Sequence, residues 1–466
     1  MNILLLNPNR GRFKIAHNVH ITFRAFIPPL GLLYIAKMAE LAGHHVKIID
    51  FNAEQDPMNT LRRSLSNMDV VGMTLLSGPE YAISQQIAQE IQKLKPDIPL
   101  ILGGPHCSLY PKQTLEDYQA DVSIQGEAEY RIVPLLNALQ GKQSLSSIPG
   151  LVYRTAGGIF STSTYEQIKN LDALPFPSRH LVRHYNYGYS FGVKVIPGVV
   201  TSMITSRGCT FHCTFCQQTA FHPTYQSLSA QRITQEIDEI VHNGYTSIVF
   251  ADDNFLANKK QTVTVMNHII KEEYDLRLWI LNARIDSADR ELFMKLRDAG
   301  VENIMFGIES GSQEILDFYN KRITLAQIRK AVNLSHEMGF FTTGNFIIGG
   351  PIENEHHIRQ TIAFARSLPL DNAIFKDLAY MAKSPLWQEA VDHGKINPDE
   401  AIVLGNPDRG LGLFTERELQ RNCDKAYFAF VTNPKYLLRE LHYSLSHHNP
   451  QFLRLGMKMF LRLHNP

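Results

Sequence analysis

The sequence lacks a charge excess of either sign and lacks long apolar runs. It carries 46 basic and 45 acidic residues, for a formal net charge of +1. Proteins that bind nucleic acid usually present a basic surface to the phosphates, so we expect no nucleic-acid partner. No run of about 18 apolar residues occurs, so no membrane-spanning helix is predicted.

Signal-peptide features and cysteine are also scarce. The apolar run at residues 3–6 is too short for a signal sequence and follows no basic segment. The chain has five cysteines, and three of them fall within eight positions. Secreted disulfide scaffolds are rich in cysteine, whereas a few closely spaced cysteines are typical of a metal site. We therefore expect a cytoplasmic protein with a metal site.

Residues 1–140 alternate short apolar runs with segments of helical periodicity. This rhythm predicts a doubly wound, Rossmann-like α/β domain with a parallel sheet. Its ligand site should lie at the carboxyl ends of the strands, where glycines let a ligand approach the backbone. The expected strands are 3–7, 46–50, 70–75, 100–103 and 122–125.

The rest of the chain predicts a second α/β domain. Residues 141–198 are interpreted as a hairpin and linker at the domain boundary. Six βα units in residues 199–396 favour a partial (β/α)6 barrel of the TIM type, with its chemistry at the strands' carboxyl ends. Residues 397–466 are expected to form a helical extension. The barrel strands are predicted at 199–205, 246–250, 277–282, 303–308, 343–348 and 373–378.

The segment Cys209-Thr-Phe-His-Cys213-Thr-Phe-Cys216 places three cysteines on one short loop after the first barrel strand. Three thiolates could each hold one iron of a [4Fe-4S] cluster and leave the fourth iron open. A zinc site with His212 as fourth ligand and a set of unliganded buried cysteines are the alternatives.

The C-x3-C-x2-C spacing, with an aromatic residue before the last cysteine, resembles the radical SAM superfamily, and the likeness extends over residues 199–383. The resemblance implies that the open iron binds S-adenosylmethionine (SAM) and that one electron cleaves it to a 5′-deoxyadenosyl radical. Asp252-Asp-Asn-Phe255 stands where the family usually has Gly-Gly-Glu to hold the SAM amine. The implied SAM contacts are Phe215, Asp253, Asn254, Arg284, Glu309, Ser310 and Asn345.

The first domain resembles the cobalamin-binding (B12-binding) domain that precedes the barrel in B12-dependent radical SAM enzymes. The Asp-x-His-x-x-Gly segment that supplies a cobalt ligand in other B12 proteins is absent. Cobalamin would then be base-off with no protein histidine on cobalt, and a domain that binds nothing is the alternative. The implied cobalamin contacts are Thr74, Leu75, Gly103, Gly104, His106, Gly126 and Glu127.

The combined resemblance implies a cobalamin-dependent, class B-like C-methyltransferase acting on a small-molecule or lipid-like substrate. Flavodoxin or ferredoxin would supply the electron. The alternatives are a non-methylating enzyme resembling the anaerobic Mg-protoporphyrin oxidative cyclase group or a rearrangement enzyme, and a cobalamin and iron–sulfur sensor. Cys107 and Cys423 are interpreted as buried thiols.

The C-terminal segment 452–463 combines an apolar face with a basic stripe. It suits either a helix docked on the barrel or a peripheral membrane contact. The basic residues are Arg454, Lys458 and Arg462.

Overall fold

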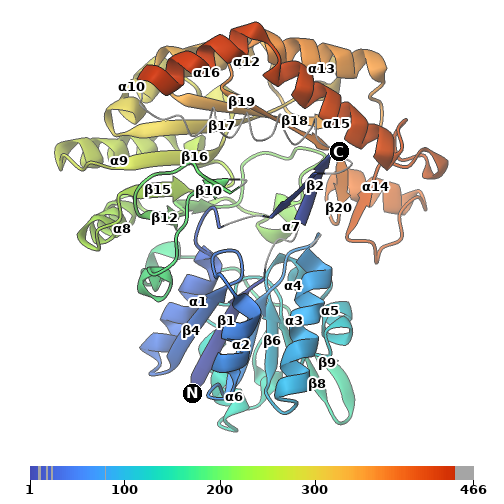
Figure 1. The fold of residues 1–466 in the computed structure, drawn as a ribbon. Helices are drawn as coiled ribbons and strands as arrows, with labels where there is room; N and C mark the ends of the chain where they lie inside the picture. The colour runs from blue at the N-terminus through green and yellow to red at the C-terminus, as the bar shows by residue number, and fades with distance from the viewer. Residues whose placement is uncertain (9–11, 17–18, 23–24, 79, 191, 447–466) are drawn as a thin grey trace. The chain divides into compact units, whose positions relative to one another are not determined.

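The computed structural model describes residues 1–8, 12–16, 19–22, 25–78, 80–190 and 192–446. The chain forms two compact units (Figure 1). Unit 1 comprises Met1–Phe13 and Thr22–Tyr187, and unit 2 comprises Lys14–Ile21 and Gly188–Pro466. Each unit is built on its own sheet, and the two sheets are described separately below.

Unit 1 contains the predicted doubly wound sheet. Its parallel strands are ordered β4-β1-β5-β6-β7, which confirms the five predicted strands. Leu4 and Leu6 pack with residues of α2 and α3 in one core, whereas Ile3 and Leu5 point to the opposite face, as alternation along a strand requires. The strands are β1 (Asn2–Asn7), β4 (His45–Asp50), β5 (Val70–Thr74), β6 (Leu100–Gly103) and β7 (Val122–Ile124).

The helices of unit 1 connect these strands and cover the sheet (Figure 1). α1 packs against α6, and α2 packs against α3. The helices are α1 (Leu30–Leu41), α2 (Pro57–Leu65), α3 (Glu80–Leu94), α4 (Pro105–Leu109), α5 (Pro111–Asp117) and α6 (Ile132–Leu139).

The predicted hairpin consists of β8 (Leu151–Thr155) and β9 (Gly158–Ser161). β8 pairs antiparallel with β7, so the hairpin extends the sheet to seven strands. The compact unit that contains this hairpin extends to Tyr187, whose hydroxyl donates to Oδ2 of the buried Asp50 at 3.1 Å.

Unit 2 contains the predicted open barrel. Six parallel strands lie in sequence order, β12-β15-β16-β17-β18-β19. Among the described residues, β12 and β19 do not pair with each other, so the barrel is partial. The strands are β12 (Val200–Met203), β15 (Ser247–Phe250), β16 (Arg277–Ala283), β17 (Val301–Glu309), β18 (Phe341–Ile348) and β19 (Asn372–Asp377).

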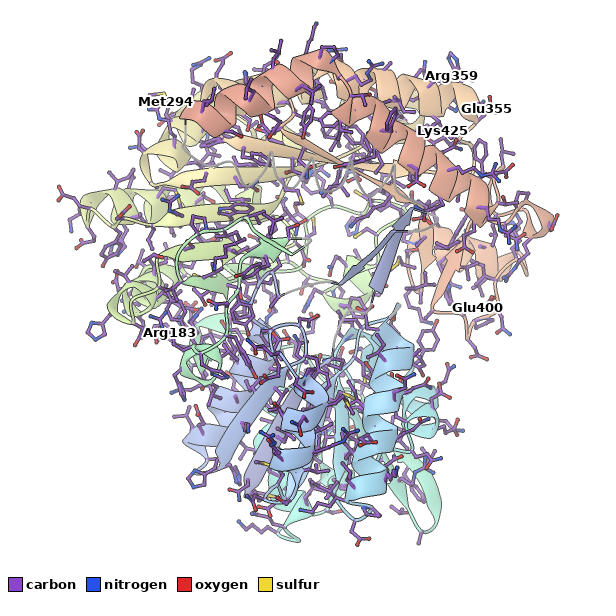
Figure 2. All side chains as sticks on the ribbon, in the orientation of Figure 1. Arg183, Met294, Glu355, Arg359, Glu400 and Lys425 are labelled. Carbon is purple, nitrogen blue, oxygen red and sulfur yellow. The ribbon has the colours of Figure 1, made fainter. Side chains whose placement is uncertain are left out.

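Helices follow the barrel strands, and most of them begin at a side-chain cap. Capping boxes begin α12, with Thr324 and Gln327, and α13, with Asn354 and His357. The exposed face of α13 carries the Glu355–Arg359 ion pair at 3.1 Å (Figure 2). The helices are α8 (Ala230–His242), α9 (Lys259–Lys271), α10 (Arg290–Asp298), α11 (Gln313–Phe318), α12 (Leu325–Glu337) and α13 (Glu355–Ser367).

The C-terminal extension is helical but also contains a strand. β21 (Ile402–Leu404) pairs antiparallel with β20 (Ala379–Met381), and α14 (Pro385–Asp392) lies between them in sequence. α15 (Glu416–Val431) begins at a capping box of Thr415 and Glu418 and packs on β19. The chain then forms α16 (Pro434–Ser446).

The proposed basic stripe of the C-terminus, Arg454, Lys458 and Arg462, lies outside the described residues. Within the part of the chain that the structure describes, every helix is too short or too polar to cross a bilayer.

α16 carries a buried carboxyl. Glu440 is 1% exposed, and within the described residues neither carboxyl oxygen has a hydrogen-bond partner. The pKa of Glu440 is raised to about 8, mainly by burial and also by nearby Asp371, while Arg439 acts in the opposite direction. Asp371 accepts a hydrogen bond from the Thr342 amide at 2.7 Å, and Arg439 donates to the Leu370 carbonyl at 2.7 Å. This polar cluster makes the docking of α16 sensitive to pH.

We predict that the stability of unit 2 falls as pH rises from about 4.5 to about 8. In that window Glu440 is ionised in the unfolded chain and protonated in the folded chain, so folding takes up a proton. Glu440→Gln removes this proton uptake. The variant should be more stable than wild type by on the order of a few kcal/mol at pH 8.5 but by little at pH 4.5. Thermal unfolding of both proteins at the two pH values measures the difference. An equal shift of the variant at both pH values would contradict this account.

Candidate iron–sulfur and cofactor sites

The three clustered cysteines lie on a loop at the carboxyl end of β12. The loop is held between β13 (Ser206–Arg207), which pairs with β14 (Gln226–Ser227), and α7 (Gln218–Phe221). The Cys216 amide donates to the Cys213 carbonyl at 3.1 Å. All five cysteines of the chain are free thiols, and Cys107 and Cys423 are buried as predicted.

The thiols of the loop are close enough to affect one another. The pKa of Cys216 is raised to about 11, mainly by burial and to a smaller extent by the neighbouring Cys213, Asp253 and Cys209. Burial also raises the pKa of Cys209. The neighbouring Cys213 raises that pKa as well, whereas Arg284 lowers it. Ionised thiolates at such sites need positive charge beside them, and iron supplies it.

The donor set of the loop is of the kind that an iron–sulfur cluster uses. In a cubane each thiolate holds its own iron, and three cysteines close in sequence can supply three such bonds. The chemistry of the three free thiols therefore suits a [4Fe-4S] cluster.

Two carboxylates at the end of β15 hold the backbone that leads into this loop. Asp252 is 1% exposed, and its Oδ1 accepts from the Thr205 amide (2.8 Å), the Thr205 hydroxyl (2.7 Å) and the Ser206 hydroxyl (2.7 Å). Burial raises the pKa of Asp252 to about 6. Asp253 Oδ2 accepts from the Gly208 amide at 3.1 Å, one residue before Cys209. Both carboxylates thus support the loop directly.

Asn254 is the residue of this strand end that fits a ligand best. It is 1% exposed, and within the described chain neither Oδ1 nor Nδ2 has a hydrogen-bond partner. A buried amide without partners is costly, and a bound polar ligand would satisfy it. Asp253, the other implied SAM contact at this strand end, differs from Asn254 in that its Oδ2 already accepts from a backbone amide.

Arg284 is already paired within the protein. Its Nε and Nη2 each donate to Asp286 at 3.0 Å, and Nη2 also donates to the Lys321 carbonyl at 2.8 Å. The guanidinium carbon lies 3.4 Å from the ring centroid of Phe211, inside the cysteine motif. Arg284 therefore contacts the cluster loop, and its implied contact with SAM stays a prediction.

Glu309 ends β17 in a left-handed backbone conformation, with φ of 68°. Such a conformation in a non-glycine residue is uncommon and clusters at functional sites. Its Oε1 accepts from Lys321 Nζ at 2.7 Å, and both side chains are less than 10% exposed. Lys321 belongs to no motif, so the sequence analysis missed it.

The remaining SAM candidates differ in their surroundings. Ser310 is fully buried, and its hydroxyl forms a hydrogen bond with the Thr361 hydroxyl at 3.1 Å and accepts another from the Ser312 amide. The Ser310 hydroxyl therefore stabilises the turn that follows β17. Asn345 is half-buried on β18 beside Gly307. Phe215 meets the Tyr319 ring edge-on, with centroids 5.1 Å apart.

A further carboxyl at the end of β18 was not predicted. Glu353 is fully buried, and its Oε2 accepts from the amides of Gly349 and Gly350. Burial raises the pKa of Glu353 to about 7. Its Oε1 and the Tyr319 hydroxyl have no partner among the described residues. The only sequence signal was an acidic residue three positions after a double glycine.

Two glycines at the carboxyl end of β6 differ in the space beside them. A Cβ at Gly103 would meet no atom within 4 Å, whereas a Cβ at Gly104 would lie 2.8 Å from the Leu75 carbonyl and the Thr74 hydroxyl. Leu75 itself is buried. The space at Gly103 is the kind of backbone opening that a flat cofactor requires.

His106 follows these glycines and is enclosed. Its Nδ1 bonds Ser77 Oγ at 2.9 Å, and Tyr81 lies edge-on with ring centroids 4.7 Å apart. Burial lowers the pKa of His106 to about 4, so the ring is neutral. Its Nε2 is buried and has no partner among the described residues. These contacts agree with a role in the pocket wall.

The end of β7 is covered by the segment that follows β9. A Cβ at Gly126 would overlap the ring of Tyr165, and Glu127 Oε2 accepts from the Ile168 amide at 2.6 Å. The structure therefore places Gly126 and Glu127 against residues 165–168. The open space lies at Gly103, nearer β5 and β6.

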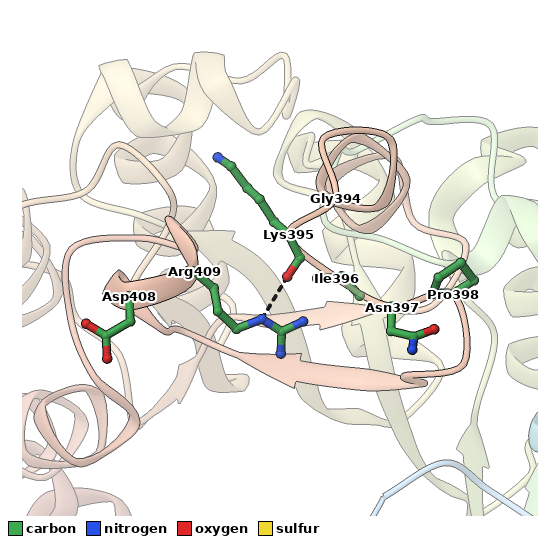
Figure 3. A pocket seen from close by; sticks show the side chains of 7 residues that line it. All are labelled: Gly394, Lys395, Ile396, Asn397, Pro398, Asp408 and Arg409. Atoms are coloured by element: carbon green, nitrogen blue, oxygen red, sulfur yellow. Dashed lines mark hydrogen bonds between the residues drawn. The ribbon is translucent and has the colours of Figure 1, made fainter.

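A shallow cavity of about 690 Å³ lies in the C-terminal extension (Figure 3). Arg409 Nε donates to the Lys395 carbonyl at 2.7 Å, and its terminal nitrogens bind Glu400 at 2.9 and 2.6 Å. None of the seven lining residues belongs to the predicted sites. They are Gly394, Lys395, Ile396, Asn397, Pro398, Asp408 and Arg409.

Residues 203–365 match the model of the Radical SAM superfamily, and residues 17–136 match the B12 binding domain. The uncharacterized methyltransferase PH0819 of Pyrococcus horikoshii is 30% identical over 89% of this chain and 90% of its own length. The anaerobic magnesium-protoporphyrin IX monomethyl ester cyclase of Cereibacter sphaeroides is 26% identical. That match covers 85% of this chain and 64% of the length of the cyclase.

Two solved structures share the fold. The radical SAM methyltransferase TsrM of Kitasatospora setae, with cobalamin and a [4Fe-4S] cluster bound, gives a TM-score of 0.67 at 19% identity, covering 84% of this chain and 75% of that one. The cobalamin-dependent SAM radical enzyme OxsB with aqua-cobalamin bound gives a TM-score of 0.68 at 17% identity. The match covers 99% of this chain and 75% of that one.

We predict that Gly103→Val weakens cobalamin binding at least about tenfold without unfolding unit 1, because the side chain enters open space. Gly157→Val, at the exposed hairpin tip, is the matched control and should bind like wild type. Titration with cobalamin, followed by its visible absorption, measures the affinity. Unchanged affinity in Gly103→Val would show that this opening is not the cobalamin site.

Proposed function

The chain belongs to the radical SAM family with a B12-binding domain, and on that basis we propose that it methylates an unactivated carbon of a small-molecule or lipid-like substrate. The observation that carries the proposal is the pairing, in one chain, of a three-thiol loop in unit 2 with an open strand end at Gly103 in unit 1. The relative from P. horikoshii is named as a methyltransferase, which supports methyl transfer.

The cofactors would supply the chemistry that side chains cannot. When bound, the cluster and SAM provide a radical able to remove hydrogen from a carbon too weakly acidic for any protein base, and cobalamin provides the methyl group. The protein's own work is to hold, orient and enclose these groups.

In unit 2, Cys209, Cys213 and Cys216 would hold three irons of the cluster. The buried amide of Asn254 would bind the SAM amino group, because both of its polar atoms lack partners within the described residues. Glu309 would accept the ribose hydroxyls while Lys321 holds the carboxylate in place. Phe215 would lie against the adenine, with Tyr319 fixing its ring.

In unit 1, the openings at the ends of β5 and β6 would receive cobalamin. We propose that cobalamin is bound base-off with no histidine on cobalt. His106 supports this assignment, because Nδ1 is committed to Ser77 and Nε2 is enclosed. A flavodoxin or ferredoxin is the proposed electron donor, and the five free thiols suit the reducing cytoplasm.

A second candidate function is an oxidative cyclase or related reaction without methyl transfer. The specific observation in its favour is the 26% identity to the magnesium-protoporphyrin cyclase over 85% of this chain. The two functions consume SAM differently, so product analysis separates them.

We expect wild-type enzyme, supplied with its substrate and a low-potential reductant, to form 5′-deoxyadenosine and S-adenosylhomocysteine in equal amounts with methylated product. One SAM molecule would be spent on the hydrogen removal and a second on restoring the methyl group of cobalamin. Chromatography and mass spectrometry quantify all three products. Deoxyadenosine without S-adenosylhomocysteine would reject methyl transfer and favour the cyclase-type reaction.

A further inference from the structure

The cluster loop is bound along one side by the segment that ends α11, residues 318–321. The Thr214 amide donates to the Tyr319 carbonyl at 3.0 Å, and the Thr214 hydroxyl donates to the Phe318 carbonyl at 3.3 Å. The Thr214 carbonyl accepts from the Leu386 amide at 2.9 Å. Thr214, which lies between two of the cysteines, therefore has all its polar groups satisfied by elements outside the loop.

Asn320 contacts the loop through a side-chain hydrogen bond. Its Nδ2 donates to the His212 carbonyl at 2.9 Å, next to Cys213. Its Oδ1 accepts from Arg322 Nε at 3.1 Å, which fixes the amide so that Nδ2 faces the loop. The backbone of Asn320 is left-handed, with φ of 50°, a conformation that asparagine tolerates better than most residues.

Lys321, the last residue of the same segment, contacts residues at the carboxyl ends of the barrel strands. Its carbonyl accepts from Arg284, whose guanidinium stacks on Phe211 of the loop. Its ammonium binds Glu309 and lies 5.9 Å from the centroid of the Phe215 ring. The segment thus contacts the loop on both sides of Cys213.

We propose that Asn320 is a positioning residue for the iron–sulfur cluster, acting through the His212 carbonyl to keep the cysteine loop closed around it. The inference rests on the proposed function only in assuming that the cluster is present. A cluster held by three thiolates depends on one short loop for every protein bond, so each opening of the loop exposes iron to water and chelators. The donor on Asn320 opposes that opening.

Asn320→Asp tests this role with little change of shape. Aspartate keeps the acceptor for Arg322 and tolerates the left-handed backbone, but it cannot donate to the His212 carbonyl. Asn243→Asp is the control for the lost amide donor and the added charge away from the cluster loop, because Asn243 Nδ2 donates at 2.8 Å to both the main-chain carbonyl and the carboxylate of Glu239 at the end of α8. Both substitutions add one negative charge.

The experiment uses the reconstituted full-length protein without SAM. Iron release to a ferrous chelator is followed by absorbance, and the reduced cluster is examined by electron paramagnetic resonance. We expect Asn320→Asp to release iron about tenfold faster. A factor of about ten in rate corresponds to the free energy of one hydrogen bond that holds the loop closed. Its resonance signal should broaden, while the melting temperature stays near that of Asn243→Asp. The control should release iron at the wild-type rate.

Wild-type release and an unchanged signal in Asn320→Asp would overturn the proposal. If that variant does not fold, Asn320→Gly keeps the left-handed backbone without the donor and is expected to release iron equally fast; wild-type release from it would also overturn the proposal. A wild-type protein that forms no cluster would instead reject the proposed function, so the two failures are distinguishable.

Discussion

The structure of unit 2 depends on keeping three partly or fully buried thiols close together on one short loop. Burial and mutual repulsion both raise the pKa of Cys216, so the loop alone favours neutral, dispersed thiols. The surrounding elements oppose this tendency. Asp252 and Asp253 fix the entry of the loop, and residues 318–321 fix its middle. Iron then supplies the charge that makes the thiolate form favourable.

The same arrangement explains why polar residues at neighbouring strand ends divide into two groups. Asp252 Oδ1, Asp253 Oδ2 and the Ser310 hydroxyl bind protein atoms and act as supports. Asp252 Oδ2 and both polar atoms of Asn254 are buried without a partner within the described chain. Buried polar atoms of this second kind are expected where a scaffold is built around a polar ligand, because the ligand then satisfies them.

The strands of both sheets could be predicted because apolar runs and helical periodicity are local properties of the sequence. The cysteine loop could be predicted because its ligands are close in sequence. Lys321, Asn320 and Glu353 could not, since their importance depends on partners that only the fold brings near. The hairpin β8–β9 was recognised, but its attachment to β7 depends on tertiary pairing.

The central claim is that Cys209, Cys213 and Cys216 hold a cluster that activates SAM. The most direct measurement is anaerobic iron quantification combined with SAM cleavage in wild type, Cys213→Ala and the buried-thiol control Cys423→Ala. The account predicts about four irons per chain and SAM cleavage in wild type and the control, and neither in Cys213→Ala. Cleavage of SAM by Cys213→Ala, or a wild-type cluster that cleaves no SAM with any reductant, would contradict it.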